Sequence, residues 1–167
     1  MDYVLHLLAG MDLSESSYVE LLSGIRQKNQ TGIQESAKRA GVTEVQSELL
    51  CSIPFLYGTM DETLNRAKEM AQNDEMRRDA EDLQAYCEAL KNLGYGDKIQ
   101  LDLSLVNDID YYNGVIFRGY TRKLPGCVLA GGQYDKAMKI LGKAGGAVGF
   151  AIYLDELTKG TQDPQRY

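Results

Sequence analysis

The fold of this 167-residue chain follows from two segments, Asn113-Gly114-Val115-Ile116-Phe117-Arg118-Gly119-Tyr120 and Cys127-Val128-Leu129-Ala130. Asn-Gly is a turn dipeptide, and the residues after it are rich in strand formers. Pro125-Gly126 interrupts the chain between the two segments, as a turn requires. The sequence therefore predicts a hairpin-like pair of neighbouring strands.

Further elements are expected on both sides of this pair. Upstream, Ile99–Leu105 alternates apolar and polar residues, which is the pattern of a strand with one buried face. Downstream, a short helix is expected at Asp135–Leu141 and another strand at Ala147–Leu154. Because strand follows strand while helices keep to the other half of the chain, we expect an antiparallel sheet in an α+β fold.

The first 95 residues predict a helical arm. Helix-start signals, in which Ser, Thr or Asp precedes Glu or Gln by three positions, recur at Asp12 with Glu15, Thr43 with Gln46, and Thr59 with Glu62. Five helices fit, and the longest, from about Asp74 to Leu93, carries one apolar stripe opposite a charged, solvated face. We therefore divide the chain into an arm at 1–95, a sheet region at 96–160 and a frayed tail at 161–167.

Composition restricts the partners. The chain has 18 Lys and Arg against 24 Asp and Glu, a net charge of -6, which disfavours nucleic acid because its binding depends on cationic contacts. No segment approaches the roughly 18 apolar residues of a membrane span, and no secretion signal is recognisable. Cys51, Cys87 and Cys127 are far apart and odd in number, as expected of reduced thiols. We expect a cytoplasmic protein that meets neither nucleic acid nor membrane.

Most catalytic patterns are absent from the sequence. The single histidine, His6, lies in an apolar stretch without a nucleophile motif, so a packed or surface histidine is expected. The glycines between 142 and 149 lack the Gly-Lys-Ser/Thr that closes a phosphate loop, and no carboxylate spacing indicates a metal site. The sequence predicts no catalytic residue, metal or cofactor.

Two clusters stand out as candidate ligand residues. Asp108–Gly114 places carboxylates and two tyrosines at the junction of two expected strands, and Ala130–Lys136 places two glycines beside a tyrosine and an acid. Tyrosines offer ring faces and hydroxyls to a small polar ligand, and glycines permit close backbone approach. A structured turn explains either cluster alone equally well, but their occurrence on neighbouring strands favours a shared site.

Three segments resemble, in order and spacing, the carboxyl-terminal part of the histidyl-tRNA synthetase catalytic core. They are Asp110–Phe117, Gly131–Asp135 and Ala147–Ile152. That family has two histidine-binding motifs, R-G-L-D-Y-Y and G-G-R-Y-D, and a third class II motif whose last arginine holds ATP. The resemblance implies part of a class II aminoacyl-tRNA synthetase-like antiparallel sheet, preceded by a helical arm.

The resemblance also implies a ligand pocket and shows where it has degenerated. Carried over by position, the pocket residues are Tyr112 and Tyr134, and Asp110 and Tyr111 support them. Gly131 and Gly132 let the backbone approach the ligand closely. The family's arginines are replaced by Asn107, Gln133 and Glu156. Because a carboxylate repels the phosphate that a guanidinium would grip, the resemblance implies a site that does not form an adenylate.

A chain that keeps the tyrosines and loses the arginines resembles the synthetase-like regulatory subunits of ATP phosphoribosyltransferase, the enzyme of the first step of histidine biosynthesis. This resemblance implies a non-catalytic protein that partners the catalytic subunit and takes part in feedback inhibition by histidine. The first two class II motifs are missing, so we expect a fragment of a longer chain, and its unpaired strand edges favour self-association. Two alternatives stay open: a divergent histidyl-tRNA synthetase core fragment, and an interaction module without a ligand.

Overall fold

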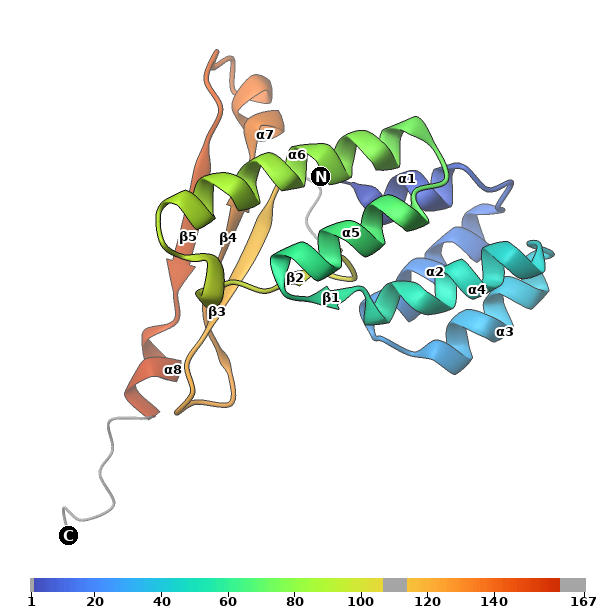
Figure 1. The fold of residues 1–167 in the computed structure, drawn as a ribbon, viewed down its shortest axis with the longest axis horizontal. Coiled ribbons are helices and arrows are strands. Elements are labelled where there is room, and N and C mark those ends of the chain that lie inside the picture. The colour runs from blue at the N-terminus through green and yellow to red at the C-terminus, as the bar shows by residue number, and fades with distance from the viewer. Residues whose placement is uncertain (1, 107–113, 160–167) are drawn as a thin grey trace, which may run out of the picture. The chain divides into compact units, whose positions relative to one another are not determined.

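The computed structural model describes residues 2–106 and 114–159 (Figure 1). It forms two compact units, residues 1–106 and 107–167, which we call the helical unit and the sheet unit. Within the described residues, no helix combines the length and the apolar character that crossing a bilayer requires.

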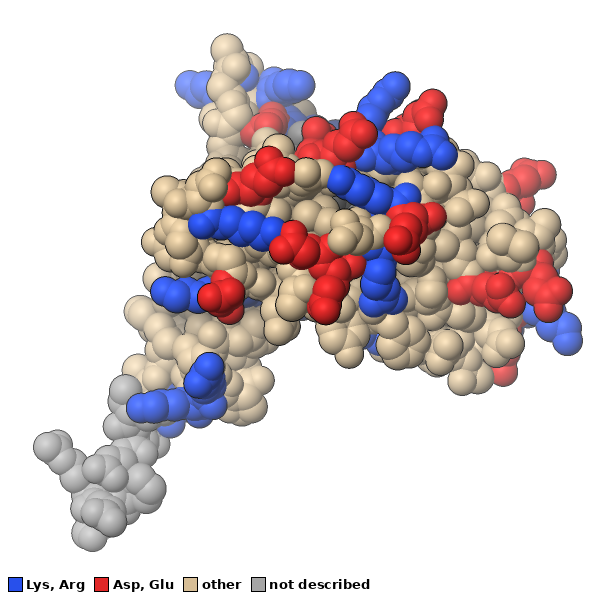
Figure 2. Space-filling view, viewed as in Figure 1, with Lys and Arg blue, Asp and Glu red and all other residues tan. Residues whose placement is uncertain are grey.

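The helical unit contains six α-helices, one more than the sequence predicts. In chain order they are α1 (Tyr3–Ala9), α2 (Glu15–Arg26), α3 (Gln30–Ala40), α4 (Glu44–Ser52), α5 (Met60–Met70) and α6 (Asp74–Asn92). Two single 3-10 turns, Ile53–Phe55 and Gly96–Lys98, complete the unit. The long helix predicted from Asp74 is confirmed, and acidic and basic side chains alternate over its solvent face (Figure 2).

Side-chain caps begin five of these helices, and the caps of α2, α4 and α5 lie at or close to the sequence signals. Thr43 and Gln46 form the predicted capping box of α4, and Thr59 accepts a hydrogen bond from the Glu62 backbone at α5. The cap of α2 is Ser14 rather than Asp12, because the Ser14 hydroxyl accepts the Ser17 N–H at 3.2 Å. Caps satisfy backbone N–H groups that a helix start leaves without partners, so they fix where each helix begins.

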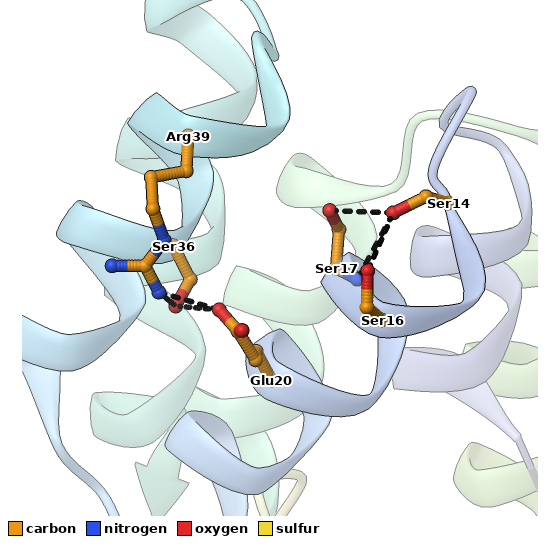
Figure 3. Close-up of polar contacts among 6 residues, drawn as sticks. All are labelled: Ser14, Ser16, Ser17, Glu20, Ser36 and Arg39. Carbon is orange, nitrogen blue, oxygen red and sulfur yellow. Dashed lines mark hydrogen bonds and ion pairs between the residues drawn. The ribbon is translucent and has the colours of Figure 1, made fainter.

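One apolar core fills the helical unit. All six helices contribute buried side chains to it, and so does the turn after α4. Among these side chains are Leu7, Leu8, Leu21, Ile25, Ile33, Leu50, Ile53, Leu64, Met76 and Cys87. Polar contacts join the helices around it. Figure 3 shows Glu20 of α2 accepting hydrogen bonds from Ser36 and Arg39 of α3, and the Arg39 contact is the main reason that the pKa of Glu20 is lowered.

The alternating segment after α6 belongs to the helical unit. Only Leu101–Asp102 form a strand, β2, and it pairs antiparallel with β1 (Tyr57–Gly58). Leu103 is buried in the helical core, and its N–H donates to the Leu56 carbonyl at 3.0 Å. Because the helical core takes up these leucines, the unit extends to Val106, beyond the division near residue 95 that the change of periodicity suggests.

The sheet unit holds the predicted antiparallel strands. They are β3 (Ile116–Tyr120), β4 (Cys127–Gln133) and β5 (Val148–Ile152), in the order β3-β4-β5. Helix α7 (Asp135–Ile140) joins β4 to β5, as predicted, and α8 (Leu154–Lys159) follows β5. The sequence pattern extends the last strand to Leu154, whereas the structure begins a helix there. The central strand of this sheet is β4, and the candidate site residues Gly131, Gly132 and Gln133 lie in it.

Candidate ligand site on the three-stranded sheet

The sequence-predicted site residues divide among three places. Gly131, Gly132 and Gln133 form the carboxyl end of β4, Tyr134 follows directly, and Glu156 lies in α8. Asn107, Asp110, Tyr111 and Tyr112 lie outside the described residues. The structure therefore gives the geometry of one half of the predicted pocket.

Gln133, one of the residues at which the sequence predicts a lost arginine, turns its amide back into the fold. Its Nε2 donates to Oδ2 of Asp135 at 2.5 Å, and its side chain lies so close to Gly114 that a Cβ there would be 2.3 Å from Oε1. The other oxygen of Asp135 accepts the Ala147 N–H at 2.8 Å. Asp135 therefore ties the end of β4 to the start of β5, a structural role that sequence reasoning did not assign to it.

Tyr134 lies against the backbone of β5. Its N–H donates to the Ala147 carbonyl at 2.8 Å, and a Cβ on Gly149 would come within 3.0 Å of the Tyr134 hydroxyl oxygen. Any residue larger than glycine at position 149 would push the phenol away. The fold therefore holds the Tyr134 ring in a defined place at the end of the sheet, which is what a ligand-binding side chain requires.

The two glycines of the motif are buried in β4. A Cβ on Gly131 would lie 2.3 Å from the Gly149 carbonyl oxygen, 2.6 Å from Cζ of Phe117 and 2.7 Å from Cβ of Phe150. Gly132 pairs with Ile116 on one side and Gly149 on the other. Close packing within the sheet is thus sufficient to require glycine at position 131.

Glu156 lies at the opposite end of the sheet from Gln133 and Tyr134. Gln133 pairs with Val148 and Leu129 with Ile152, so β5 runs from the Tyr134 end toward α8. At about 3.3 Å per residue, a strand the length of β4 spans roughly 20 Å. The structure therefore does not bring the two degenerate positions, Gln133 and Glu156, into contact.

An open pocket of about 660 Å³ surrounds Glu156. Gly126, Cys127 and the residues Ile152–Glu156 line it. The Glu156 carboxylate accepts a hydrogen bond from Lys159 and lies against Gly126, where a Cβ would be 2.9 Å from Oε2. The pocket therefore contains a half-buried carboxylate that pairs with a lysine of the same helix.

The cysteines and carboxylates of the described residues make no metal site. No three side chains among His, Cys, Asp and Glu come together there in an arrangement that would hold an ion. The three cysteines are free thiols, and burial is the first cause that raises the pKa of Cys51 and Cys87. Burial therefore favours the protonated thiol at both positions.

His6 is outside the candidate site and has a structural partner. Its Nδ1 lies 2.7 Å from Oδ2 of Asp79, which joins α1 to α6. The expectation of a packed or surface histidine agrees with this contact. No nucleophile is among its described hydrogen-bond partners.

Comparisons with known proteins define the class. The chain resembles a solved structure described as an ATP phosphoribosyltransferase regulatory subunit/histidyl-tRNA synthetase from Bacillus halodurans, with a TM-score of 0.82 and 26% identity over 96% of this chain and 42% of that one. It also shares the fold of a histidine–tRNA ligase subunit from Alicyclobacillus acidocaldarius, with a TM-score of 0.69 and 21% identity over 94% and 51% of the two chains. The helical arm and antiparallel sheet are thus part of a class II synthetase-like fold.

The chain belongs to the histidyl-tRNA synthetase family, whose model matches residues 1–157. Its curated relatives include the ATP phosphoribosyltransferase regulatory subunits of Bacillus cereus, 31% identical, and of Alkaliphilus metalliredigens, 28% identical. The matched region covers 92% of this chain but 34% and 39% of those proteins. The chain therefore spans little more than a third of the length of these relatives.

Proposed function

We propose that this chain is the synthetase-like part of a regulatory subunit of ATP phosphoribosyltransferase, acting in the first step of histidine biosynthesis. The observation that carries the proposal is a carboxylate, Glu156, which accepts a hydrogen bond from Lys159 beside Gly126. We assign Glu156, on the strength of the motif, to the position of the family's ATP-binding arginine. The names of the curated relatives support the same assignment.

The electrostatics of the site argue against aminoacylation. Activation of an amino acid requires cations that stabilise the charge on transferring phosphate groups. Glu156 adds a negative charge at one such position, and Gln133 offers a neutral amide that is already bound to Asp135 at another. Arginine contributes a planar, bidentate grip on phosphate that neither side chain reproduces. The proposed role is therefore non-catalytic.

The tyrosine end of the sheet is the proposed histidine site. Tyr134 supplies a fixed ring and hydroxyl, and we assign Tyr112, with Asp110 and Tyr111 in support, to the same pocket on the strength of the motif. Gly132 would admit the ligand close to the backbone of β4, whereas at Gly131 the space is filled by Phe117, Phe150 and the Gly149 carbonyl. Histidine bound here would act as the feedback signal of the complex.

The proposed partners follow from the same assignment. A regulatory subunit associates with the catalytic subunit of ATP phosphoribosyltransferase, and the resulting complex, rather than this chain, transfers the phosphoribosyl group. We propose a cytoplasmic complex in which the chain also associates with itself.

Histidine-dependent exchange between pyrophosphate and ATP tests the non-catalytic assignment. The assay is run on the chain and on the full-length protein that contains it, with a histidyl-tRNA synthetase as positive control. No exchange above the buffer rate is expected. Exchange at a rate comparable to the control would overturn the proposal in favour of a ligase.

Calorimetric titration with histidine tests the ligand site separately. The full-length protein is expected to bind histidine, and Tyr134→Phe is expected to weaken binding about tenfold, because a hydrogen bond to a buried polar ligand contributes about 1–2 kcal/mol. Equal affinity of the two proteins would remove Tyr134 from the pocket. Absence of binding by the unaltered full-length protein would favour an interaction module without a ligand.

A further inference from the structure

One charged residue lies in the three strands of the sheet unit. It is Arg118, in the middle of β3, and every other residue of β3, β4 and β5 is uncharged. An opposite charge directly across on the next strand would stabilise it. Arg118 pairs with Ala130, however, and Ala130 pairs with Ala151. Pairing between the strands therefore does not explain an arginine at this position.

The strand register places Arg118 and the Tyr134 ring on the same face of the sheet. A Cβ on Gly149 would come within 3.0 Å of the Tyr134 hydroxyl oxygen, so the ring lies over Gly149. Gly149 pairs with Gly132, and Gly132 pairs with Ile116, so these three positions share one face. Because side chains alternate between the two faces of a strand, Arg118, two residues after Ile116, lies on it as well. We call this face of the sheet the tyrosine face.

The opposite face of the sheet is apolar. A Cβ on Gly131 would contact the Phe117 and Phe150 side chains there. Gln133 lies two residues after Gly131 in β4 and therefore belongs to this opposite face. A cation for a ligand on the tyrosine face is thus supplied by Arg118 and not by position 133.

The separation between Arg118 and the tyrosine ring suits a small ligand. From the spacing of strands and the rise per residue, the Cα of Arg118 lies roughly 12 Å from the Cα of Gly149, beneath the ring. Both side chains extend from the same face, so the guanidinium and the phenol border one stretch of the sheet. The residues between them have no side chain larger than a methyl group, and they are Gly132, Ala130 and Ala151.

We propose that Arg118 binds the carboxylate of the amino acid that contacts Tyr134. A guanidinium holds a carboxylate through two parallel hydrogen bonds, and a neutral amide cannot form this charged pair. The inference rests on the proposed function, because it adds a carboxylate anchor to the proposed histidine site. It also restricts the ligand to a free amino acid, since the carboxyl group of a residue within a peptide is an amide.

Calorimetric titration of the full-length protein with histidine and with histidinamide tests the inference. Histidinamide keeps the imidazole ring and the amino group and replaces the carboxylate by a neutral amide. Arg118→Met is expected to weaken histidine binding about thirtyfold, as loss of a hydrogen bond between charged groups does, and to change histidinamide binding less than about twofold. Arg118→Lys keeps the charge without the planar fork, so it is expected to weaken histidine binding less than Arg118→Met does.

Arg122→Met is the matched control, since it removes the same charge from the loop that follows β3. It is expected to bind both compounds as the unaltered protein does. Circular dichroism establishes that each variant is folded. If Arg118→Met does not fold, Arg118→Lys and the preference of the unaltered protein for histidine over histidinamide decide the question.

The outcomes separate the inference from the function on which it rests. If the unaltered full-length protein binds neither compound, the proposed histidine site and this inference both fail. If it binds the two compounds equally, or if Arg118→Met binds histidine as the unaltered protein does, only the inference is overturned. Equal weakening by Arg118→Met and Arg122→Met, or an equal loss of both compounds in Arg118→Met, would give Arg118 a general role in charge or structure and would likewise overturn it.

Discussion

Individual side chains decide how closely the strands of the sheet unit approach. At Gly131 the Phe117 and Phe150 side chains and the Gly149 carbonyl occupy the space that a Cβ would need. The sequence motif that contains Gly131 does not explain why glycine is required there, because Phe117 and Phe150 are distant from it along the chain. Sequence reasoning found the residue, and only the strand register explains it.

Gly131→Ala is expected to destabilise the sheet unit by about 1–3 kcal/mol, because overpacking forces neighbouring groups to shift. Hydrogen exchange of the β4 amides is the measurement, since their protection reports opening of this sheet. Gly145→Ala is the matched control: nothing lies within 4 Å of a Cβ there. Equal protection of β4 in the two variants would contradict the packing described for Gly131.

A second residue-level prediction concerns Tyr3, whose hydroxyl donates to the Ala67 carbonyl at 2.5 Å. Burial first, and the Asp79 carboxylate second, raise the pKa of Tyr3 from 10.0 to about 12. The phenol must stay protonated in the folded state, while the unfolded chain releases its proton above pH 10. Stability is therefore complete below pH 10 and falls as the pH rises from 10 toward 12.

Urea unfolding at a series of pH values checks this behaviour. Tyr3→Phe is expected to lower the free energy of unfolding by about 1 kcal/mol at pH 8, the usual net value of one hydrogen bond. It is also expected to make the decline between pH 10 and 12 shallower. Tyr95→Phe, at a 47% exposed position, is the control at pH 8 and should be neutral. An undiminished alkaline decline in Tyr3→Phe would refute the role of this phenol.

At the scale of single elements, the sequence predicted the features that depend on residues close together along the chain. The capping box of α4 and the long helix α6 agree with the sequence because both depend on residues three or four positions apart. The pairing of β2 with β1 was not predictable in this way. The alternation of apolar and polar residues in Ile99–Leu105 indicates that one face is buried. It does not indicate that this face packs against a core made of helices.

The α4 capping box gives a test at this scale. Thr43→Ala removes the acceptor for the Gln46 N–H and is expected to cost about 1 kcal/mol in the free energy of unfolding. Thr31→Ala, at an exposed position inside α3, should change stability by less than about 0.5 kcal/mol. Urea unfolding followed by circular dichroism measures both. Equal values for the two variants would show that the box contributes nothing.

At the scale of the whole molecule, the core and the candidate site belong to different units. Every side chain of the main apolar core lies between Tyr3 and Leu103, whereas Gly131, Gly132, Gln133, Tyr134 and Glu156 all lie in the sheet unit. The motif resemblance names candidate site residues but does not give the distance between Gln133 and Glu156. That separation depends on the antiparallel register of β4 and β5, which no local pattern specifies.

This division predicts that the helical unit folds without the sheet unit. A polypeptide ending at Val106 retains the whole main core and the β1–β2 pair, so it is expected to unfold cooperatively with the helical circular dichroism of α1–α6. A second polypeptide ending at Tyr95 lacks Leu101 and Leu103 and should be less stable. Equal stability of the two would contradict the inclusion of residues 96–106 in the helical unit.

The proposal of a regulatory role is tested most directly by the phosphoribosyl-transfer rate of the catalytic subunit as the protein that contains this chain is added. A regulatory subunit is expected to raise the rate with added protein until it saturates, and histidine is then expected to lower the rate. A rate that stays at the level of the catalytic subunit alone at every concentration would contradict the regulatory role.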